Sequence, residues 1–207
     1  MKRYFVSGIG TDIGKTICSA ILVEAMLADY WKPVQAGALE YTDTMRVKDL
    51  ITNVSSKFHA EQFKLRAPMS PHAAAKSDGI EIHLHDFILP DTKNNLIIEG
   101  AGGLLVPLNH QGDFVIDLAK ELKAEIILIS KNYLGSINHS LLSIEAIQNR
   151  NIPVKGIIFN GEPNEETESI ICKLSGLKKL GSVPLTEHIS KEFIIDQANK
   201  LRAAIEP

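Results

Sequence analysis

The stretch GIGTDIGKT at positions 8–16 lies between a short apolar run, residues 4–6, and a helical pattern that starts at Ile17. Glycines at such a junction let the backbone fold so that successive N–H groups and the amino end of the helix face phosphate oxygens. Lys15 adds a positive charge, and the hydroxyl of Thr16 is a suitable ligand for Mg²⁺. The stretch therefore predicts a phosphate-binding loop that leads into a helix.

The loop departs from the usual spacing G-x-x-x-x-G-K-T. Ile9 stands where the first glycine would fall, so the loop is one residue longer when it is counted from Gly8. The alternative is a glycine-rich turn that contains Gly-Lys-Thr by chance. The strand and helix patterns on either side favour a phosphate-binding loop.

Short runs of Ile, Val, Leu and Phe recur along the chain, at residues 4–6, 96–98, 126–129 and 154–159. The runs are continuous rather than alternating, which is typical of strands that are covered on both faces. Helical spacing lies between them, as in Ile17, Ile21, Leu22 and Ala25; Val115, Leu118, Ala119 and Leu122; and Ile137, Leu141, Ile144 and Ile147. We therefore predict an α/β fold with a mostly parallel β-sheet flanked by helices.

Weaker patterns predict a short strand that ends at residues 31–34, a helix near 44–51 and a C-terminal helix from about 194 to 204. Residues 53–94 show little periodicity, and we expect loops and short helices there. A length of 207 residues, 44% of them hydrophobic, suits one core, so we expect residues 1–207 to form a single domain.

Composition excludes several classes of protein. The formal net charge of −3 leaves no basic field for nucleic acid or for an anionic membrane. Cys18 and Cys172 are far apart and form no C-x-x-C pair, so we expect small buried apolar residues rather than a disulfide or a zinc site. The first apolar run is too short for a secretion signal, and no segment approaches the ~18 apolar residues of a membrane span. A cytoplasmic protein is expected.

Two further features suit phosphate chemistry. Glu99 follows the apolar run 96–98 and precedes Gly100-Ala101-Gly102-Gly103. Parallel sheets bind ligands at the carboxyl ends of their strands, where an acid can help to hold a metal and small residues let backbone amides approach a ligand. A strand-end acid followed by a flexible turn is the alternative. Lys32 follows the second predicted strand and could add a second positive charge, although alone it would be an ordinary surface lysine.

Five motifs occur in a specific order: the loop ending at residues 14–16, then residues 32–34, 70–72, 99–103 and 135–139. In this combination, and nearly from end to end, the chain resembles the dethiobiotin synthetase family, which has a P-loop NTPase fold. The resemblance implies an ATP- and Mg²⁺-dependent ligase of biotin biosynthesis. Such a cyclo-ligase joins 7,8-diaminononanoate and CO₂ into the cyclic urea of dethiobiotin, by way of a carbamate and a carbamic-phosphoric anhydride, and releases ADP and phosphate.

The resemblance also implies roles for individual residues. The Mg²⁺ ligands would be Thr16, Asp49 and Glu99, and the catalytic residues would be Lys15 and Lys32. The ATP-binding residues would be Asp12, Ile13, Gly14, Lys15, Thr16, Ile17, Asp49 and Glu99, with Asn160, Pro184 and Leu185 near the base. The substrate-binding residues would be Thr11, Lys32, Ala36, Ser70, Pro71, His72, Gly100, Ala101, Gly102 and Asn138. Asn138 would reach the substrate of a neighbouring subunit in a homodimer with shared active sites.

Two departures from the family pattern stand out. Relatives often carry a hydroxyl residue where this chain has Ala36, so a hydrogen bond there would be missing or supplied by Tyr41 or Thr42. The acid of the phosphate loop, frequently Glu in relatives, is Asp12 here.

Three other interpretations fit the sequence less well. His83 and His85 have the spacing of a metal pair, but no third ligand is near in the sequence, which favours exposed loop histidines. An amidoligase acting on a cobalamin precursor would usually carry an additional glutaminase domain. A nucleotide-switch ATPase of the partitioning type would carry an extra lysine near the start of the loop, where residues 8–10 are Gly-Ile-Gly.

Overall fold

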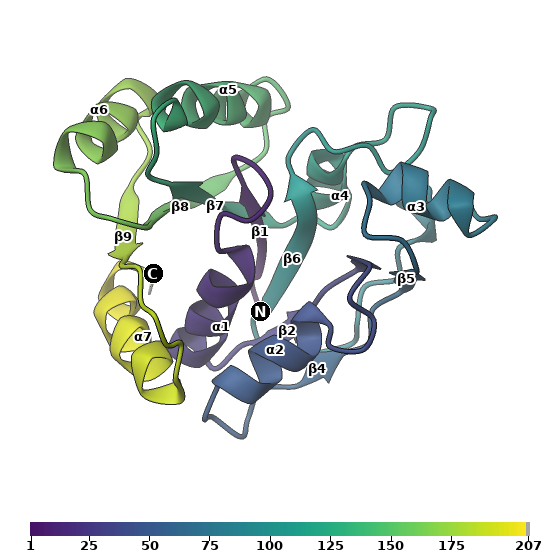
Figure 1. The fold of residues 1–207 in the computed structure, drawn as a ribbon, viewed down its shortest axis with the longest axis horizontal. Coiled ribbons are helices and arrows are strands. Elements are labelled where there is room, and N and C mark those ends of the chain that lie inside the picture. The colour runs from purple at the N-terminus through teal and green to yellow at the C-terminus, as the bar shows by residue number, and fades with distance from the viewer. Residues whose placement is uncertain (206–207) are drawn as a thin grey trace.

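The computed structural model describes residues 1–205 and is built around a seven-stranded sheet in which every pairing between neighbouring strands is parallel (Figure 1). The strand order is β4-β2-β6-β1-β7-β8-β9. The strands are β1 (Arg3–Gly8), β2 (Asp29–Trp31), β4 (Phe58–His59), β6 (Leu96–Gly103), β7 (Glu125–Lys131), β8 (Val154–Asn160) and β9 (Lys179–Val183). The predicted α/β fold with a parallel sheet is confirmed.

Helices cover both faces of the sheet (Figure 1). One face is covered by α1 (Lys15–Met26), α2 (Asp43–Leu50) and α7 (Lys191–Ile205), and the other by α4 (Val115–Glu121), α5 (Ser136–Gln148) and α6 (Glu165–Ser175). A parallel pair, β3 (Val34–Ala36) and β5 (Phe63–Leu65), lies beside the sheet with α3 (Pro71–Ser77) and the 3₁₀ helix η1 (Leu84–Asp86). No helix within residues 1–205 has the length and apolar character needed to cross a bilayer.

The two faces of the sheet bury separate apolar clusters. In β1, Phe5 packs with the cluster under α4 and α5, whereas Tyr4 and Val6 pack with the cluster under α1 and α7. Successive strand side chains point to opposite faces, so a strand covered on both sides must be apolar at every position. This is why the strands appear in the sequence as continuous apolar runs.

The structure departs from the sequence prediction in three places. The strand predicted to end at residues 31–34 is interrupted, because β2 ends at Trp31 and Val34 begins β3 of the separate two-stranded sheet. Residues 53–94 contain the short strands β4 and β5 in addition to α3 and η1, because two or three paired residues leave no periodic signal. Glu99 does not end its strand: β6 continues to Gly103, which pairs with Gly8 beyond an irregularity in the register. In the described part of the chain both cysteines are free, with Cys18 buried and Cys172 half-buried.

A buried carboxylate anchors the amino end of β2. Asp29 accepts hydrogen bonds from the backbone N–H of Lys57 (2.9 Å), from Thr92 Oγ1 (2.6 Å) and from Asn94 Nδ2 (2.9 Å), and lies 3.3 Å from His59 Nε2. Burial alone would raise the pKa of Asp29, but the hydrogen bonds from Thr92 and Asn94 outweigh it and lower the pKa. The carboxylate therefore joins β2 to its neighbours on both sides and fixes the strand that leads into the site described below.

We expect Asp29→Asn to lower the free energy of unfolding by about 2 kcal/mol at pH 7, because several charge-assisted hydrogen bonds are weakened. A carboxyl group with a lowered folded-state pKa stabilises the fold above its unfolded pKa of ~3.9, and this stabilisation is lost as the pH falls through the folded pKa. Urea unfolding should therefore show a difference between variant and wild type that shrinks at acidic pH. Exposed Asp91→Asn is the control, and an equal loss in both variants would contradict the prediction.

Candidate active site

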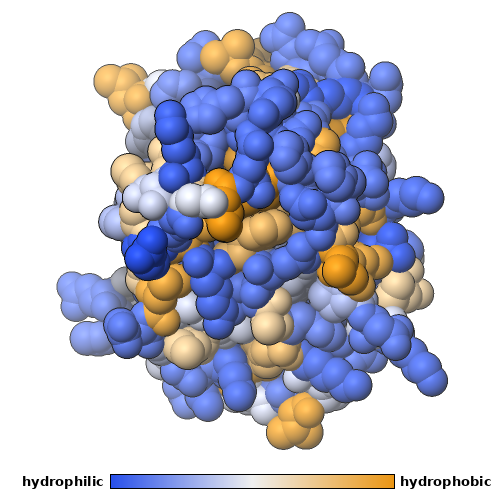
Figure 2. Space-filling model, turned by 90° about the vertical axis from the view of Figure 1, so that its right-hand side faces the viewer, coloured by the Kyte–Doolittle hydropathy of each residue, from blue (hydrophilic) through white to orange (hydrophobic). Residues whose placement is uncertain are grey.

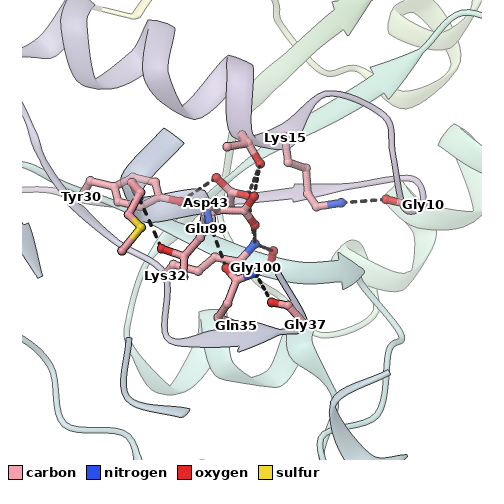
Figure 3. Close-up of polar contacts among 12 residues, drawn as sticks. Gly10, Lys15, Tyr30, Lys32, Gln35, Gly37, Asp43, Glu99 and Gly100 are labelled. Atoms are coloured by element: carbon pink, nitrogen blue, oxygen red, sulfur yellow. Dashed lines mark hydrogen bonds and ion pairs between the residues drawn. The ribbon is translucent and has the colours of Figure 1, made fainter. Parts of the chain in front are cut away.

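The phosphate-binding loop joins β1 to α1 and is contacted by Asn160 at the end of β8. Gly14 has φ 93°, in the left-handed region that favours glycine, and a Cβ atom there would collide with the amide of Asn160. Asn160 Nδ2 donates to the carbonyl oxygen of Ile13 at 2.8 Å. At the front of the loop, Lys15 Nζ donates to the carbonyl oxygen of Gly10 at 2.9 Å (Figure 3). The loop shape is thus set by glycine and by a partner from another strand.

One lysine and two carboxylates meet beside this loop (Figure 3). Lys32 follows β2 directly, and its Nζ lies 2.8 Å from Asp43 Oδ2 and 3.0 Å from Glu99 Oε1. Thr16 Oγ1 donates to Glu99 Oε1 at 2.9 Å and lies 3.2 Å from Asp43 Oδ1. The group brings together residues from α1, the end of β2, the first turn of α2 and β6.

The charges in this group act on one another. Burial lowers the pKa of Lys15 to about 8, and the positive charge of Lys32 adds to this shift. Burial alone would lower the pKa of Lys32, but the negative charges of Glu99 and Asp43 outweigh it and raise the pKa. Asp43 shows the reverse: burial would raise its pKa, and Lys32 lowers it. Lys32 and Asp43 are therefore a charged pair at neutral pH.

Two buried neutral side chains contact the carboxylate residues. Tyr30 in β2 donates its hydroxyl to Glu99 Oε2 at 2.9 Å. Burial, together with the charge of Glu99, raises the pKa of Tyr30 well above its usual value, so the hydroxyl acts as a donor. Gln35 Nε2 donates to the carbonyl oxygen of Gly37 (3.0 Å), and its Oε1 accepts from the backbone N–H of Asp43 (3.2 Å). Neither side chain was assigned a role from the sequence.

A cavity of about 740 Å³ opens over this group. Most residues predicted from the sequence line it: Thr11, Asp12, Gly14, Lys15, Thr16, Ile17, Lys32, Ala36, Ser70, Pro71, Glu99, Ala101 and Gly102. Asp43, Gln35 and Arg46 also line it and were not predicted. Arg46 lies one helical turn after Asp43 in α2, so its side chain falls on the same face of the helix.

The remaining predicted residues lie outside the cavity lining. Ile13 is packed in the core, and Gly100 is buried and accepts a hydrogen bond from Lys32 through its carbonyl oxygen. His72 lines a second cavity of about 380 Å³, and its Nδ1 lies 3.1 Å from Ser70 Oγ. Asn138 is exposed on the first turn of α5.

Asn160 lies behind the phosphate loop, and Pro184 and Leu185 are exposed just after β9. These three residues share the edge of the sheet at which the loop lies, because β8 and β9 are parallel to β1 through β7.

The structure places the predicted ligand Asp49 away from Thr16. Asp49 is exposed and accepts a hydrogen bond from the hydroxyl of Tyr41 at 3.0 Å, while Asp43 is the acid beside Thr16. Six residues in a helix correspond to ~240° of rotation and ~9 Å of rise, so the two acids of α2 face different directions. The signal that could have separated them is Thr42, which caps α2 by accepting from Met45 N and so places Asp43 in the first turn.

The contacts of Tyr41 and Thr42 show whether either residue supplies the hydroxyl group that is missing at position 36. Ala36 lines the cavity, whereas Tyr41 and Thr42 are not among its lining residues. The hydroxyl of Tyr41 donates to Asp49, and that of Thr42 accepts from Met45 N at the helix cap. Neither hydroxyl group therefore faces the cavity in place of a side-chain hydroxyl at position 36.

His83 and His85 lie at η1 with stacked rings, and no group of three His, Cys, Asp or Glu side chains among residues 1–205 could hold a metal ion.

Comparison with known proteins agrees with this geometry. A family model described as an AAA domain matches residues 2–192. The ATP-dependent dethiobiotin synthetase BioD of Cytophaga hutchinsonii is 54% identical over 202 residues, which cover 97% of each chain. The enzyme of the same name from Christiangramia forsetii is 47% identical and covers 97% of this chain and 96% of its own. The chain belongs to the dethiobiotin synthetase family. It is an ATP-dependent ligase.

Solved structures of other proteins share the fold at low sequence identity. A putative plasmid partition protein from Borrelia burgdorferi, bound to AMPPNP, has a TM-score of 0.57 at 12% identity, with 98% of this chain and 97% of that chain covered. The cell division ATPase MinD of Pyrococcus furiosus has a TM-score of 0.56 at 12% identity, with 98% and 99% covered. These structural similarities bear on the fold, which is that of P-loop NTPases, and not on the activity or the substrate.

The two acids of α2 provide a matched pair of variants. We expect Asp43→Asn to raise the Mg²⁺ concentration needed for half-maximal ATP turnover roughly tenfold or more, because a neutral amide is a poorer ligand for a hard cation. Asp49→Asn, on the exposed face of the same helix, should leave the Mg²⁺ titration unchanged. The reverse result, with Asp49 sensitive and Asp43 not, would restore the assignment made from the sequence.

Proposed function

We propose that this ligase closes the cyclic urea of dethiobiotin from 7,8-diaminononanoate and CO₂, with ATP as the phosphoryl donor. The observation that carries the proposal is the meeting of the phosphate loop, Lys15, Lys32 and two carboxylates in one cavity. The volume of that cavity lies within the range of small-molecule sites. The names of the close relatives, which mention ATP and dethiobiotin, support this choice of reaction. Because ATP is the co-substrate, we expect the enzyme to act in the cytoplasm. We also expect residues 1–207 to act as a single ligase domain.

The reaction would take place in three steps. One amine of the diamine attacks CO₂, forms a C–N bond and loses a proton, which leaves a carbamate. A carbamate oxygen then attacks the γ-phosphorus of ATP, and the bond to the ADP oxygen breaks to give a carbamic-phosphoric anhydride. The second amine attacks the carbonyl carbon, the C–O bond to phosphate breaks, and the ring closes with loss of a second amine proton.

The two lysines would supply most of the protein's contribution to these steps. Negative charge is present or develops on the carbamate and on the transferring phosphoryl group, and fixed ammonium groups stabilise it. Lys15 lies in the phosphate loop and Lys32 beside it, so we assign Lys15 to the phosphates and Lys32 to the oxygens shared by phosphate and carbamate. The raised pKa of Lys32 keeps its ammonium group charged at neutral pH.

The oxygen atoms beside the loop fit a Mg²⁺ ion. Thr16 Oγ1 lies 2.9 Å from Glu99 Oε1 and 3.2 Å from Asp43 Oδ1, which makes a compact set of hard oxygen donors. We therefore propose Thr16, Asp43 and Glu99 as the residues that hold it, with Asp43 in place of Asp49. Bound there, Mg²⁺ would neutralise part of the triphosphate charge. Two carboxylates do not complete the coordination of the ion, so phosphate oxygens and water would supply the rest.

A second copy of the chain would complete the site. Asn138 lies outside the cavity of its own chain, and the surface around it exposes Ile137, Tyr133 and Leu134. Exposed apolar side chains in one place are typical of an interface. For comparison, the face drawn in Figure 2 is largely hydrophilic, with apolar groups scattered over it. We propose a homodimer in which the first turn of α5 contributes Asn138 to the partner's substrate. We also keep Asn160, Pro184 and Leu185 as the proposed base-binding residues.

The reaction itself can be tested directly. The protein should convert ATP, bicarbonate and 7,8-diaminononanoate, in the presence of Mg²⁺, into a product with the mass of the cyclic urea. A nucleotide switch of the partitioning type, which shares this fold, would hydrolyse ATP without making this product. ATP turnover that does not depend on the diamine would therefore contradict the proposal.

Shared active sites predict complementation between two inactive variants. Lys15→Ala should lower turnover ~10²-fold by removing a fixed donor at a developing charge, and Asn138→Asp should block the substrate across the interface. After subunit exchange, one site of the mixed dimer contains both intact residues and should regain activity. Sedimentation should show a dimer, and absence of recovery after confirmed exchange would mean that each site is built from a single chain.

A further inference from the structure

The two oxygens of the Glu99 carboxylate have different partners. Oε1 is 2.9 Å from Thr16 Oγ1 and 3.0 Å from Lys32 Nζ, on the side that faces the phosphate loop. Oε2 accepts a hydrogen bond from the hydroxyl of Tyr30 at 2.9 Å. Glu99 is 1% exposed and Tyr30 is 0% exposed, so both residues are buried. The tyrosine therefore holds one side of the carboxylate while the other side faces the chemistry.

The sheet places the two side chains next to each other. Tyr30 in β2 is paired with Ile97 in β6, and Glu99 lies two residues beyond Ile97 on the same face of that strand. The ring of Tyr30 is packed against the ring of Phe58 in β4, with 6.0 Å between centroids. The hydroxyl thus comes from a ring that is fixed on a paired strand, and it reaches the carboxylate diagonally.

We propose that Tyr30 is a positioning residue, which fixes the plane of the Glu99 carboxylate so that Oε1 faces Thr16 and Lys32. The terminal torsion of glutamate is broad, so a carboxylate with one oxygen free can turn. Partners of this kind typically change metal affinity by about 10-fold to 100-fold although they do not touch the metal. The inference rests on the proposed role of Glu99 as a Mg²⁺ ligand, and the tests below separate the two.

Tyr30→Phe removes the hydroxyl and keeps the ring. We expect roughly tenfold weaker binding of Mn²⁺ in the presence of AMPPNP, measured from the electron paramagnetic resonance signal of free Mn²⁺, and a similar rise in the Mg²⁺ concentration for half-maximal turnover. Tyr4→Phe is the matched control, because Tyr4 is a buried tyrosine in the same apolar cluster and lies in β1, on the other side of β6 from β2. It should leave Mn²⁺ binding unchanged. Unaltered Mn²⁺ binding by folded Tyr30→Phe protein would overturn the proposal.

A double-variant comparison keeps the test valid if Tyr30→Phe also loses stability. If Tyr30 acts through Glu99, adding Tyr30→Phe to Glu99→Gln should cause no further loss of Mn²⁺ affinity, whereas independent effects would add. Additive losses would overturn the proposal and leave Tyr30 as a packing residue. Wild-type Mn²⁺ affinity in Glu99→Gln would instead refute the proposed ligand role of Glu99, and with it this inference. Weaker binding by Glu99→Gln together with normal binding by Tyr30→Phe would refute the positioning role alone.

Discussion

The contact of Lys32 with Asp43 and Glu99 is the interaction on which the site depends. Removing three charges from water is costly, and the cost is met only when each charge has a close partner and its remaining polar atoms are satisfied. Here the ammonium group lies within 3.0 Å of both carboxylates, while Thr16, Tyr30 and the backbone of Gly100 take up other positions. Segments far apart in the sequence are thereby joined at one point, and the phosphate loop is one of them.

The parallel sheet explains why such a group can form at that point. β2 has only three residues and stops at Trp31, so Lys32 emerges beside β6, which continues to Gly103. A short strand beside a long one creates a step at the carboxyl edge, and Glu99 lies within that step with its side chain toward α1 and α2. The buried Asp29 fixes β2 at its other end. The position of Lys32 is therefore set by where β2 ends and by the anchoring of that strand.

Local sequence patterns were sufficient for much of this. The phosphate loop, the alternation of strands with helices, and the placement of Lys32 and Glu99 after apolar runs could all be recognised, since each depends on neighbours within a few residues. Asp43 and Asp49 were not separated, because both are acids on one short helix and the direction of each depends on where the helix begins, which the cap at Thr42 marks. Tyr30 and Gln35 escaped notice for a related reason. Their contacts are made with residues outside their own strands, Tyr30 with Glu99 of β6 and Gln35 with the first residue of α2, and each lies in a strand of only three residues.

The fit between Gly14 and Asn160 has a consequence for how this sequence can change over generations. The amide of Asn160 fills the space that a side chain at position 14 would need, and at the same time it holds the carbonyl of Ile13. A larger residue at position 14 would require a smaller one at position 160, and that change would release the loop. A substitution at either position alone would therefore not be neutral. Substitutions at two positions 146 residues apart in the chain are thus coupled, because the side chain of one residue occupies the space beside the backbone of the other.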